Sequence, residues 1–580
     1  MKRLRARLVL AAGLLVIILI SVVLIARQSR SLFQRGLEGW ESQRQDLTIW
    51  FDDIEGKTTI TADDGDKITG FVVAQLRSQK GVELPSNWQQ DTMPRIVLLS
   101  ISDSRMPARV VLGTGRGIVS ALNQAITQAR SLLESPLSTV WIKLDIVEEV
   151  FTLERLDPNQ PLELERSLYG LAFQRQSGIV FLPEELVANT LVGVQHFLQT
   201  DNVIQYLQRE PTRAQAYQHL FQAQPIRAFR FSTASFCYDG SEIFPLYRGH
   251  RYWKQLEHKQ LYKAAVEGGK YLSQVVDTDG KFVYIYSPKT NAAPPKYNLL
   301  RHAGSVYAMF ELYQVTGDKE LLAAAERALG YLLNSIKTST TNAGPSACLV
   351  GDGNYVKLGG NALAVIALAK YIETTGDRKY LPLLQQLGRW IKSVQSSNGQ
   401  FAVHKQSYTD GRVIDFESQY YPGEAILALV RINALDRNKA WLDAAEAGAQ
   451  YLINVRDENL SEKKLPHDHW LLYALNELYR QRPKPLYLEQ AMRLARAMLR
   501  AQRRNPKYPD WRGGFFKPPR STPTATRMEG LCAAYKLAKD FGRQADAEAI
   551  LAGLRLGAIF QLQTQFRPES AMYLQNPLRA

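Results

Sequence analysis

The chain has 580 residues, of which 45% are hydrophobic and 10% aromatic, and this length predicts two or more domains because it exceeds one ordinary core. Its formal charge is +15, but six of these charges lie in the first thirty residues, which contain no acid, so the remainder carries +9 (15 − 6). This mild excess, with no basic run interleaved with aromatic residues, argues against nucleic acid as a partner.

A long apolar segment follows the basic N-terminus. Leu8–Ala26 contains 19 uncharged residues, about the length of a helix that crosses a bilayer. More Lys and Arg precede it than follow it closely, so residues 1–30 are predicted to form a cytoplasmic tip and a transmembrane anchor. A cleaved signal peptide competes with this interpretation, but the apolar run is longer than that of a usual signal peptide, and no small-x-small site follows it before Arg27. We expect a single-pass bacterial inner-membrane protein that contacts lipid through residues 8–26, with periplasmic or extracellular C-terminal domains.

Strand and helix patterns alternate after this anchor. Residues 31–90 are expected to form a polar stalk and the start of an α+β domain, and residues 91–225 the domain itself. The runs RIVLLSI, ARVVLGTG and TVWIKLDIVEEVF predict strands, and GIVSALNQAITQARSLL predicts a helix before the third of them. Gly113–Gly117 has neither the spacing of GxGxxG nor the Lys of a P-loop, so a tight strand-to-helix turn is expected there.

The segment from Leu168 to Ala188 has the sequence LYGLAFQRQSGIVFLPEELVA. It resembles the strand, turn and strand of AMMECR-like domains. The RGCIG-like motif of that family is missing, so the resemblance implies no activity. A helix is expected from Val192 to Arg209. Residues 226–257 are too aromatic for a free linker, and we expect an aromatic connecting arm there.

Apolar and amphipathic helical segments alternate through the C-terminal half. Runs such as AILALVRI, from Ala425, are apolar on nearly all sides, as expected of inner helices, whereas LDRNKAWLDAAEAGAQYLINV is amphipathic, as expected of an outer helix. Asp318, Asp377 and Asp436 mark equivalent turns 59 residues apart (377 − 318 and 436 − 377). A fixed spacing with shared patterning indicates a repeat architecture.

Over residues 258–580 this pattern resembles the six-hairpin (α/α)6 toroid superfamily, which includes glycoside hydrolases, polysaccharide lyases and sugar epimerases. The turns VQSSNGQF, VVDTDGKF and WRGGFF resemble those of the related terpenoid cyclases, but no DxDD or DDxxD motif occurs. The implied fold is mainly α: a transmembrane helix, a small α+β domain and a toroid. A sixth inner helix could begin only at Arg567, which leaves the closure of the ring open.

In such a ring the loops that enter the inner helices converge on one mouth, where catalytic groups are expected. Glycoside hydrolysis needs a carboxylic acid and a carboxylate, and Asp352, Glu417 and Asp468 come from three successive entrances. We predict that these three are catalytic, although Asp468 could instead cap the following helix. The substrate-binding residues predicted around the mouth are Arg301, His302, Tyr421, His467, Trp470, Trp511, Arg527 and Glu529.

Metal and redox chemistry have no support in the sequence. Cys237, Cys348 and Cys532 stand far apart without a CxxC motif, so neither a disulfide framework nor a zinc site is predicted, and one structural disulfide stays open. No cofactor or metal is implied.

The expected function is that of an outward-facing, carbohydrate-active protein whose partner is a polysaccharide or oligosaccharide, with a glycoside hydrolase as the first choice. A polysaccharide lyase or sugar epimerase is the alternative, because Arg301, His302, Tyr421 and His467 supply a cation, a base and an acid. A non-catalytic glycan-binding or polysaccharide-assembly subunit is the third interpretation.

Overall fold

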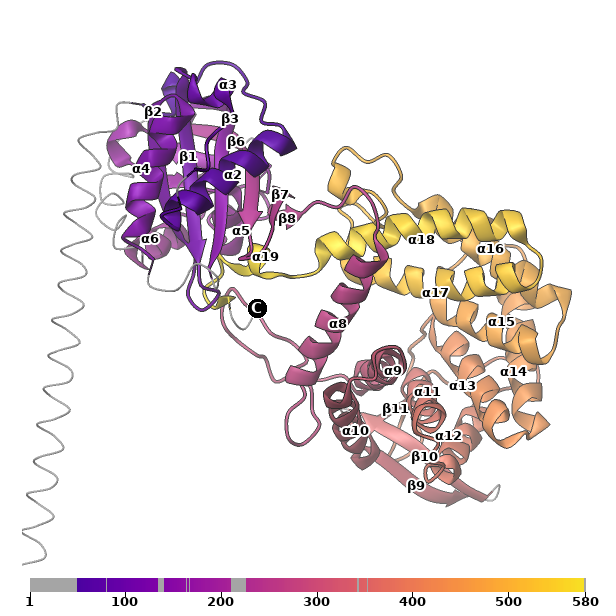
Figure 1. Cartoon of the computed structure of the whole chain (residues 1–580). Helices are drawn as coiled ribbons and strands as arrows, with labels where there is room; N and C mark the ends of the chain where they lie inside the picture. The colour runs from indigo at the N-terminus through magenta and orange to yellow at the C-terminus, as the bar shows by residue number, and fades with distance from the viewer. Residues whose placement is uncertain are drawn as a thin grey trace, which may run out of the picture. The chain divides into compact units, whose positions relative to one another are not determined.

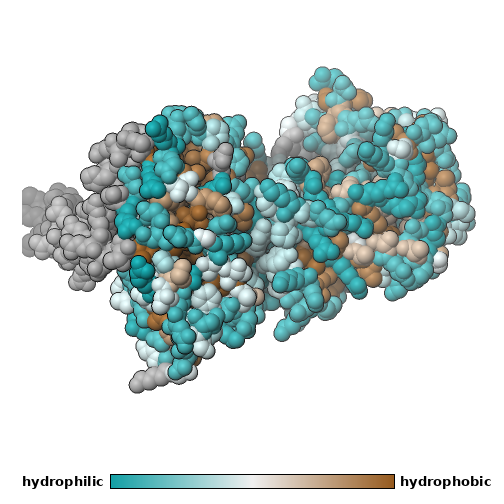
Figure 2. Space-filling model, turned by 90° about the horizontal axis from the view of Figure 1, so that it is seen from above, coloured by the Kyte–Doolittle hydropathy of each residue, from teal (hydrophilic) through white to brown (hydrophobic). Residues whose placement is uncertain are grey.

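The computed structural model describes residues 49–79, 81–133, 140–162, 164–165, 167–209, 226–341, 344–351 and 353–577. The predicted anchor and most of the stalk lie outside these residues, and no helix within them is long and apolar enough to cross a membrane. Hydrophilic residues dominate the face seen in Figure 2, with hydrophobic residues in scattered groups among them. The chain divides into two compact units: Met1–Tyr252, Ser287–Asn291 and Phe566–Ala580 form the first, and Trp253–Tyr286 and Ala292–Gln565 form the second.

The first unit is built around an antiparallel sheet (Figure 1). Its strands are β1 (Pro94–Ser102), β2 (Arg109–Arg116), β3 (Trp141–Leu156), β4 (Gly170–Phe173), β5 (Val180–Phe181), β6 (Ile226–Tyr238), β7 (Ile243–Tyr247) and β8 (His250–Arg251). They pair in the order β2-β1-β3-β6-β4-β5, with β7 beside β6 and β8 beside β7. The three strands predicted from the apolar runs are therefore β1, β2 and β3.

Helices α2 (Ala62–Leu76) and α4 (Ile118–Arg130) pack their apolar sides against one face of this sheet, where Val72 and Leu122 join one hydrophobic core with the strands. The predicted strand-to-helix turn is present. Gly117 has a φ of 82°, and a Cβ atom there would lie 2.0 Å from the carbonyl oxygen of Asp91, so only glycine fits. The shorter helices of the unit are α3 (Ser86–Gln89), α5 (Pro183–Ala188) and α6 (Thr200–Arg209).

Two predictions for this part of the chain were wrong. The connecting arm at residues 226–257 is instead β6, β7 and β8, because its aromatic side chains pack within the sheet and β6 pairs with β3 along most of its length. The helix predicted from Val192 begins only at Thr200, since Val192 and Leu198 form a β-bridge before it.

The opposite face of the sheet carries buried charges. Lys143 and Asp145 alternate along β3 with apolar residues that face the α2–α4 side. The Nζ of Lys143 lies 2.6 Å from Asp145 and 3.2 Å from Glu184, and neither Lys143 nor Asp145 reaches solvent. Each of these charges would destabilise the folded unit if it were buried without a partner. The ion pairs therefore offset the cost of burying charge on this face of the sheet.

The C-terminal segment, residues 566–577, covers this charged face. The hydroxyl groups of Tyr573 and Ser100 are hydrogen-bonded at 2.7 Å, and Arg251 donates to Glu569 at 3.1 Å. Its single helical turn, α19 (Pro568–Ala571), contacts β3 and β8. The remnant from Arg567 thus belongs to the first unit and does not supply a sixth inner helix.

The second unit consists of helical hairpins in which inner and outer helices alternate (Figure 1). The inner helices are α9 (Leu299–Thr316), α11 (Leu358–Thr375), α13 (Tyr421–Asp436), α15 (His469–Gln481) and α17 (Ser521–Asp540). The outer helices are α8 (His258–Gln274), α10 (Lys319–Asn334), α12 (Leu381–Ser393), α14 (Lys439–Tyr451), α16 (Pro485–Ala501) and α18 (Gln544–Thr564). Each inner helix packs on the next, and α18 contacts α8, so the predicted toroid of alternating helices is confirmed for the described residues. A small sheet is formed by β9 (Ile336–Thr341), β10 (Gly344–Gly351) and β11 (Tyr355–Lys357), which lie between α10 and α11, and by β12 (Lys405–Ser407), which lies between α12 and α13.

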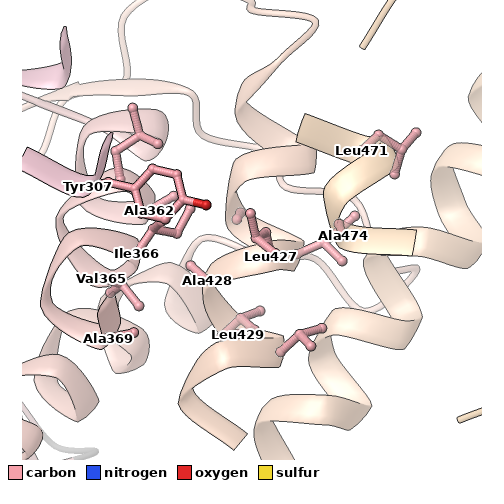
Figure 3. Close-up of a cluster of buried hydrophobic side chains, with 14 of the residues drawn as sticks. Tyr307, Ala362, Val365, Ile366, Ala369, Leu427, Ala428, Leu429, Leu471 and Ala474 are labelled. Carbon is pink, nitrogen blue, oxygen red and sulfur yellow. The ribbon is translucent and has the colours of Figure 1, made fainter. Parts of the chain in front are cut away.

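Small side chains bring the inner helices close together. Figure 3 shows Ala362 and Ala369 of α11 beside Ala428 of α13, with Ala474 of α15 on the other side. All four are fully buried, and so is α13 from Tyr421 to Asn433 on every side. An all-round apolar sequence is what a helix surrounded by other helices requires.

One flank of the inner ring is open. On α9, Arg301, Ala308 and Val315 recur every seven residues, on one helical face, and all are exposed. A corresponding exposed face on α17 carries Glu529 and Lys536. These faces lie where a sixth inner helix would pack in a complete ring, so solvent reaches the interior from this side.

Candidate active site

Each inner helix carries a charged or phenolic side chain in an otherwise apolar stretch. We call the group of these side chains the axial cluster, and it comprises Tyr307, Glu311, Lys370, Arg431, Tyr473, Glu477 and Glu529. Arg431 of α13 donates to Tyr307 of α9 at 3.4 Å, although α11 lies between these helices in the ring. Such a contact can form only across the interior, so the cluster lies inside the ring of inner helices.

Arg431 is the fixed cation of the cluster. Its guanidinium is buried and contacts Glu477 of α15 at 2.8 Å. Its distance to the ring centre of Tyr307 is 5.0 Å. The ion pair crosses from α13 to α15 and holds the two helices in register, since Arg431 alone would be left buried without compensation.

Glu311 of α9 lies between a hydrogen-bond donor and a cation. The Tyr307 hydroxyl donates to it at 2.6 Å, and Lys370 of α11 lies 3.6 Å from it. Its side chain is 43% exposed, so water and small polar molecules can reach it.

Glu529 of α17 differs in character from Glu311. Solvent reaches its side chain, but the groups packed around the carboxyl remove much of its hydration. This desolvation, together with the negative charge of Glu311, raises the pKa of Glu529 to about 7. Glu529 can therefore hold a proton near neutral pH, while Glu311 accepts a hydrogen bond from Tyr307. General acid and base catalysis requires such a division between an acid that carries a proton and a second carboxyl group that accepts hydrogen bonds.

A chain of aromatic rings leads from the helix entrances toward this pair. Ring centres are 5.4 Å apart for Tyr420 and His469, 5.1 Å for His469 and Trp470, and 5.7 Å for Trp470 and Tyr473. We call these four residues the aromatic ladder. Tyr473 is also close enough to Glu529 and Glu311 to interact with their charges. His469 is buried, whereas Tyr420, Trp470 and Tyr473 are half-buried, and half-buried rings offer apolar faces to a sugar.

The predicted catalytic trio is not assembled in the described residues. Asp468 is the buried N-cap of α15, and its Oδ1 accepts from the amide of Leu471 at 3.1 Å. Glu417 is exposed in the loop before α13, and Asp352 lies outside the described residues. Glu417 and Asp468 share only an electrostatic interaction with Arg456, which is itself paired with Asp457 at 2.7 Å. Asp468 therefore caps α15, which is the alternative role that the sequence also allowed.

A different acid faces Asp468. Glu424, in the first turn of α13, is 2% exposed, and neither its Oε2 nor the Oδ2 of Asp468 has a hydrogen-bond partner among the described residues. Burial, opposed by Arg456, raises the pKa of Asp468 to about 7, and burial with the nearby Asp468 raises that of Glu424 well above its usual value. A Cβ on Gly359 would lie 2.2 Å from Glu424 Oε2, so the acid is wedged against α11.

The Arg301-His302 pair is divided. His302 is buried with both ring nitrogens in use, by the Tyr297 hydroxyl at 2.6 Å and by the carbonyl of Ala328 at 2.7 Å. Its burial lowers its pKa to about 4. Arg301 lies on the exposed face of α9. His302 therefore fastens α9 to α10, and only Arg301 remains available to a ligand.

The remaining predicted binding residues lie near the entrances to α13, α15 and α17. Tyr421 is buried and packs against His404 and Phe416, with ring centres 6.0 and 5.8 Å away. Trp511 contacts Tyr508 at 4.9 Å in a turn before α17. His467 and Arg527 are hydrogen-bonded to each other at 2.9 Å.

Most of the axial cluster escaped the sequence analysis. Apart from Glu529, it was missed because catalytic groups were expected only in the loops that enter the inner helices and not deep within those helices. The signal was present as one charged residue deep inside each inner-type helix, as in AMFELY, LAKYIE, LVRIN and LNELY. All three cysteines are free, which answers the open question of a disulfide.

Comparisons with known proteins gave likenesses of structure only. No family model and no curated protein matched the chain. It is similar to D-mannose isomerase, with 15% identity over 52% of this chain and 87% of that one and a TM-score of 0.37. It is also similar to cellobiose 2-epimerase from Bacillus thermoamylovorans, with 12% identity over 50% and 85% and a TM-score of 0.39. An inactive α-1,6-mannanase of Salegentibacter sp., in complex with α-1,6-mannotriose, is similar at 12% identity over 52% and 98%, with a TM-score of 0.38.

Proposed function

We propose that the second unit is a carbohydrate-active enzyme, and most concretely a glycoside hydrolase in which Glu529 is the general acid and Glu311 the second carboxylate. The observation that carries the proposal is the pair of accessible acids inside the ring: Glu311, which accepts a hydrogen bond from Tyr307 and lies close to Lys370, and Glu529, which has a pKa of about 7.

The proposed chemistry uses each acid once. Protonated Glu529 would donate to the oxygen that leaves the glycosidic bond, while Glu311 would either activate water or attack the sugar carbon. The aromatic ladder would hold the sugar by stacking, and the open flank between α9 and α17 would admit it. Arg431 and Lys370 would stabilise negative charge at the carboxylate after proton transfer.

A sugar epimerase or polysaccharide lyase remains the second candidate. It is favoured by two neutral imidazoles near the entrances, since burial and the charge of Arg527 lower the pKa of His467 to about 4 and that of His469 to about 3. A neutral imidazole beside an arginine suits removal of a carbon-bound proton next to a carbonyl or carboxylate group. This chemistry would need His467 or His469 and would tolerate the loss of Glu529.

Substitution of Glu529 separates these candidates. Glu529→Gln should lower the hydrolytic kcat by a factor of about 10² to 10⁴ and leave binding intact, because general acid catalysis contributes about that much. Glu326→Gln, an exposed acid on outer helix α10, is the matched control and should keep full activity. Normal turnover by Glu529→Gln would refute the hydrolase proposal. Loss of turnover in His469→Asn alone would favour the epimerase or lyase.

A non-catalytic glycan-binding subunit would behave differently again. In that case Glu529→Gln would change nothing measurable, whereas Trp470→Ala would weaken glycan binding through loss of its stacking surface. Turnover assays and calorimetric binding on the same two variants therefore distinguish an enzyme from a binding module.

We also propose that Leu8–Ala26 anchors the protein in a bacterial inner membrane with both units outside the cytoplasm. The support is the apolar sequence and the basic residues before it. In spheroplasts, external protease should digest the tagged C-terminal units, and the tagged protein should sediment with membranes. Release of the full-length protein by osmotic shock would contradict the anchor.

A further inference from the structure

Three arginines surround a single exposed phenylalanine in the turn before α17. The guanidinium carbons of Arg520 and Arg527 lie 5.0 and 5.1 Å from the ring centre of Phe516, and Arg503 donates to the Phe516 carbonyl. Phe516 is 48% exposed and has a φ of 76°. A bulky residue in the left-handed region is strained, and such strain concentrates at binding sites. We call Arg503, Arg520 and Arg527 the arginine cluster.

Arg527 is 8% exposed and has no carboxylate partner in the described part of the chain. Its neighbours are His467, which accepts from Nε at 2.9 Å, the Pro523 carbonyl at 2.8 Å, and the ring of Phe515 at 5.1 Å. The other two buried arginines differ. Arg251 pairs with Glu569 at 3.1 Å and Arg431 with Glu477 at 2.8 Å.

An uncompensated buried guanidinium lowers stability, so its presence calls for another explanation. The histidines beside it do not compensate the charge, because both are neutral at physiological pH. Arg503 and Arg520 add positive charge at the same turn, and neither forms an ion pair among the described residues. The local charge is therefore positive, and an anion from outside the chain would complete it.

The position of the arginine cluster beside the aromatic ladder indicates which kind of ligand carries this anion. His469 lies close enough to Arg527 for the charge of Arg527 to lower its pKa. From His469 the aromatic ladder leads through Trp470 to Tyr473 and the acid pair. A ligand that spans the ladder would place sugar rings on the aromatic faces and an acidic substituent at the arginines. Guanidinium groups bind carboxylates and sulfates through paired, charge-assisted hydrogen bonds.

We propose that the arginine cluster is a subsite for the anionic substituent of an acidic carbohydrate, such as the carboxylate of a uronate. This inference rests on the proposed action of the second unit on carbohydrates and adds the class of substrate. Arg527 and Arg520 recognise the charge, while Phe516 and the ladder contact the neighbouring sugars.

The test is calorimetric binding of matched oligosaccharides to the full-length protein in detergent. The probes are a trigalacturonate, its carboxyl-reduced neutral counterpart, and the same neutral trisaccharide bearing a sulfate. The wild-type protein should bind trigalacturonate at least about tenfold tighter than the neutral probe, which is about 1.4 kcal/mol. Tight binding of the sulfated probe as well would support recognition of charge, whereas its exclusion would support a carboxylate-specific subsite.

Variants assign the preference to the cluster. Arg527→Gln and the exposed Arg520→Gln should each reduce the preference for the acidic probe while leaving the affinity for the neutral probe unchanged. Arg555→Gln, which removes an exposed positive charge from α18, should keep the wild-type preference. Arg520→Gln keeps the test valid if Arg527→Gln does not fold.

Equal binding of acidic and neutral probes by the wild type would overturn the proposal, as would an unchanged preference in both cluster variants or no binding of any probe. These outcomes are separate from those of the hydrolase test. Full turnover by Glu529→Gln with a preference that depends on Arg527 would refute the hydrolase and leave the acidic subsite standing.

Discussion

Glu424 and Asp468 meet in the interior of the second unit without a hydrogen bond to each other. Asp468 accepts from the Leu471 amide with one oxygen, and its other oxygen, like Oε2 of Glu424, has no hydrogen-bond partner among the described residues. Gly423 lies between them, since a Cβ there would approach both oxygens of Asp468 to 3.0 and 3.1 Å. Two ionised carboxyls could not coexist at such a place, so the pair retains a proton over the physiological range.

Asp468→Asn should make the unfolding free energy less dependent on pH. The folded pKa of Asp468, about 7, exceeds the value of about 3.9 in an unfolded chain, so wild-type stability falls as pH rises from about 4 to about 7. Asn keeps the cap but cannot ionise. The variant should match the wild type near pH 4 and exceed it near pH 8 by on the order of 4 kcal/mol. Denaturant unfolding at both pH values measures this difference.

Asp318→Asn is the matched control, because Asp318 caps α10 at its surface end and accepts from the amides of Glu320 and Leu321. Its stability should stay within a few tenths of a kcal/mol of the wild type. A stability gain for Asp468→Asn that is equal at pH 4 and pH 8 would show that ionisation of Asp468 is not its cause.

Glu529 should set the alkaline limb of the activity profile. A general acid must be protonated to act, so kcat should fall above about pH 7, where Glu529 loses its proton. Steady-state rates between pH 5 and pH 9 on any accepted glycan provide the measurement. A rate that stays constant up to pH 9 would exclude Glu529 as the acid.

Among the elements, the turns after α8, α12 and α16 share one construction. Each contains a glycine with positive φ that lies against a backbone carbonyl of the next outer helix. Gly280 contacts α10, Gly399 contacts α14 and Gly513 contacts α18. In two of them a glutamine also spans the contact, as Gln395 does by donating to Ala444 at 2.9 Å. These turns hold successive outer helices together.

Gly399→Ala should destabilise the second unit by about 2 kcal/mol or more. The added Cβ would lie 2.3 Å from the Ala447 carbonyl oxygen, in a backbone conformation with φ of 91°. Gly376→Ala has a similar φ of 75° but open space around it, so it should cost only about 1 kcal/mol. Thermal unfolding of the two variants measures the difference, and equal losses would show that the packing against α14 contributes nothing.

Local sequence patterns predicted the helices better than the strands. Inner helices such as α13 were recognisable because burial on all sides leaves an apolar run that no surface helix has. By contrast, β6 finds its partner β3 at a separation of about 90 residues, as in Ser235 with Asp145, and no local pattern encodes that pairing. The axial cluster could not be predicted from local patterns either, because it depends on which helices face one another across the ring. Arg527 was predicted at the mouth, but only the structure shows that its charge has no carboxylate partner among the described residues.

For the whole molecule, the most consequential feature is that the chain returns to its first unit at the end. Residues 566–577 bring Ala571, Met572, Tyr573 and Leu574 into a core with Trp50 and Phe51 of the first unit. They also bring the Glu569 carboxylate to Arg251. The first unit is therefore made of segments separated by more than 300 residues.

Removal of residues 566–580 should loosen the first unit and spare the second. Without this segment Arg251 loses a buried partner, and the hydroxyl of Ser100 loses that of Tyr573. Hydrogen exchange should become faster in β1 and β3 and stay slow in α13. Tyr573→Phe, which removes only one hydroxyl, should cost about 1 kcal/mol and change exchange little. Unchanged protection of β1 and β3 in the truncated protein would contradict this role.

The return of the C-terminal segment also dictates an order of events during synthesis. The first unit emerges from the ribosome early, yet one side of its sheet receives its cover only after the roughly 300 residues of the second unit have been made, a delay of about 15 to 60 s at the usual elongation rates. During that interval Lys143, Asp145 and the apolar residues around them face water or a chaperone. The nascent first unit is therefore a substrate for protective factors for longer than its size suggests, and it becomes resistant to proteases only after the second unit has been made.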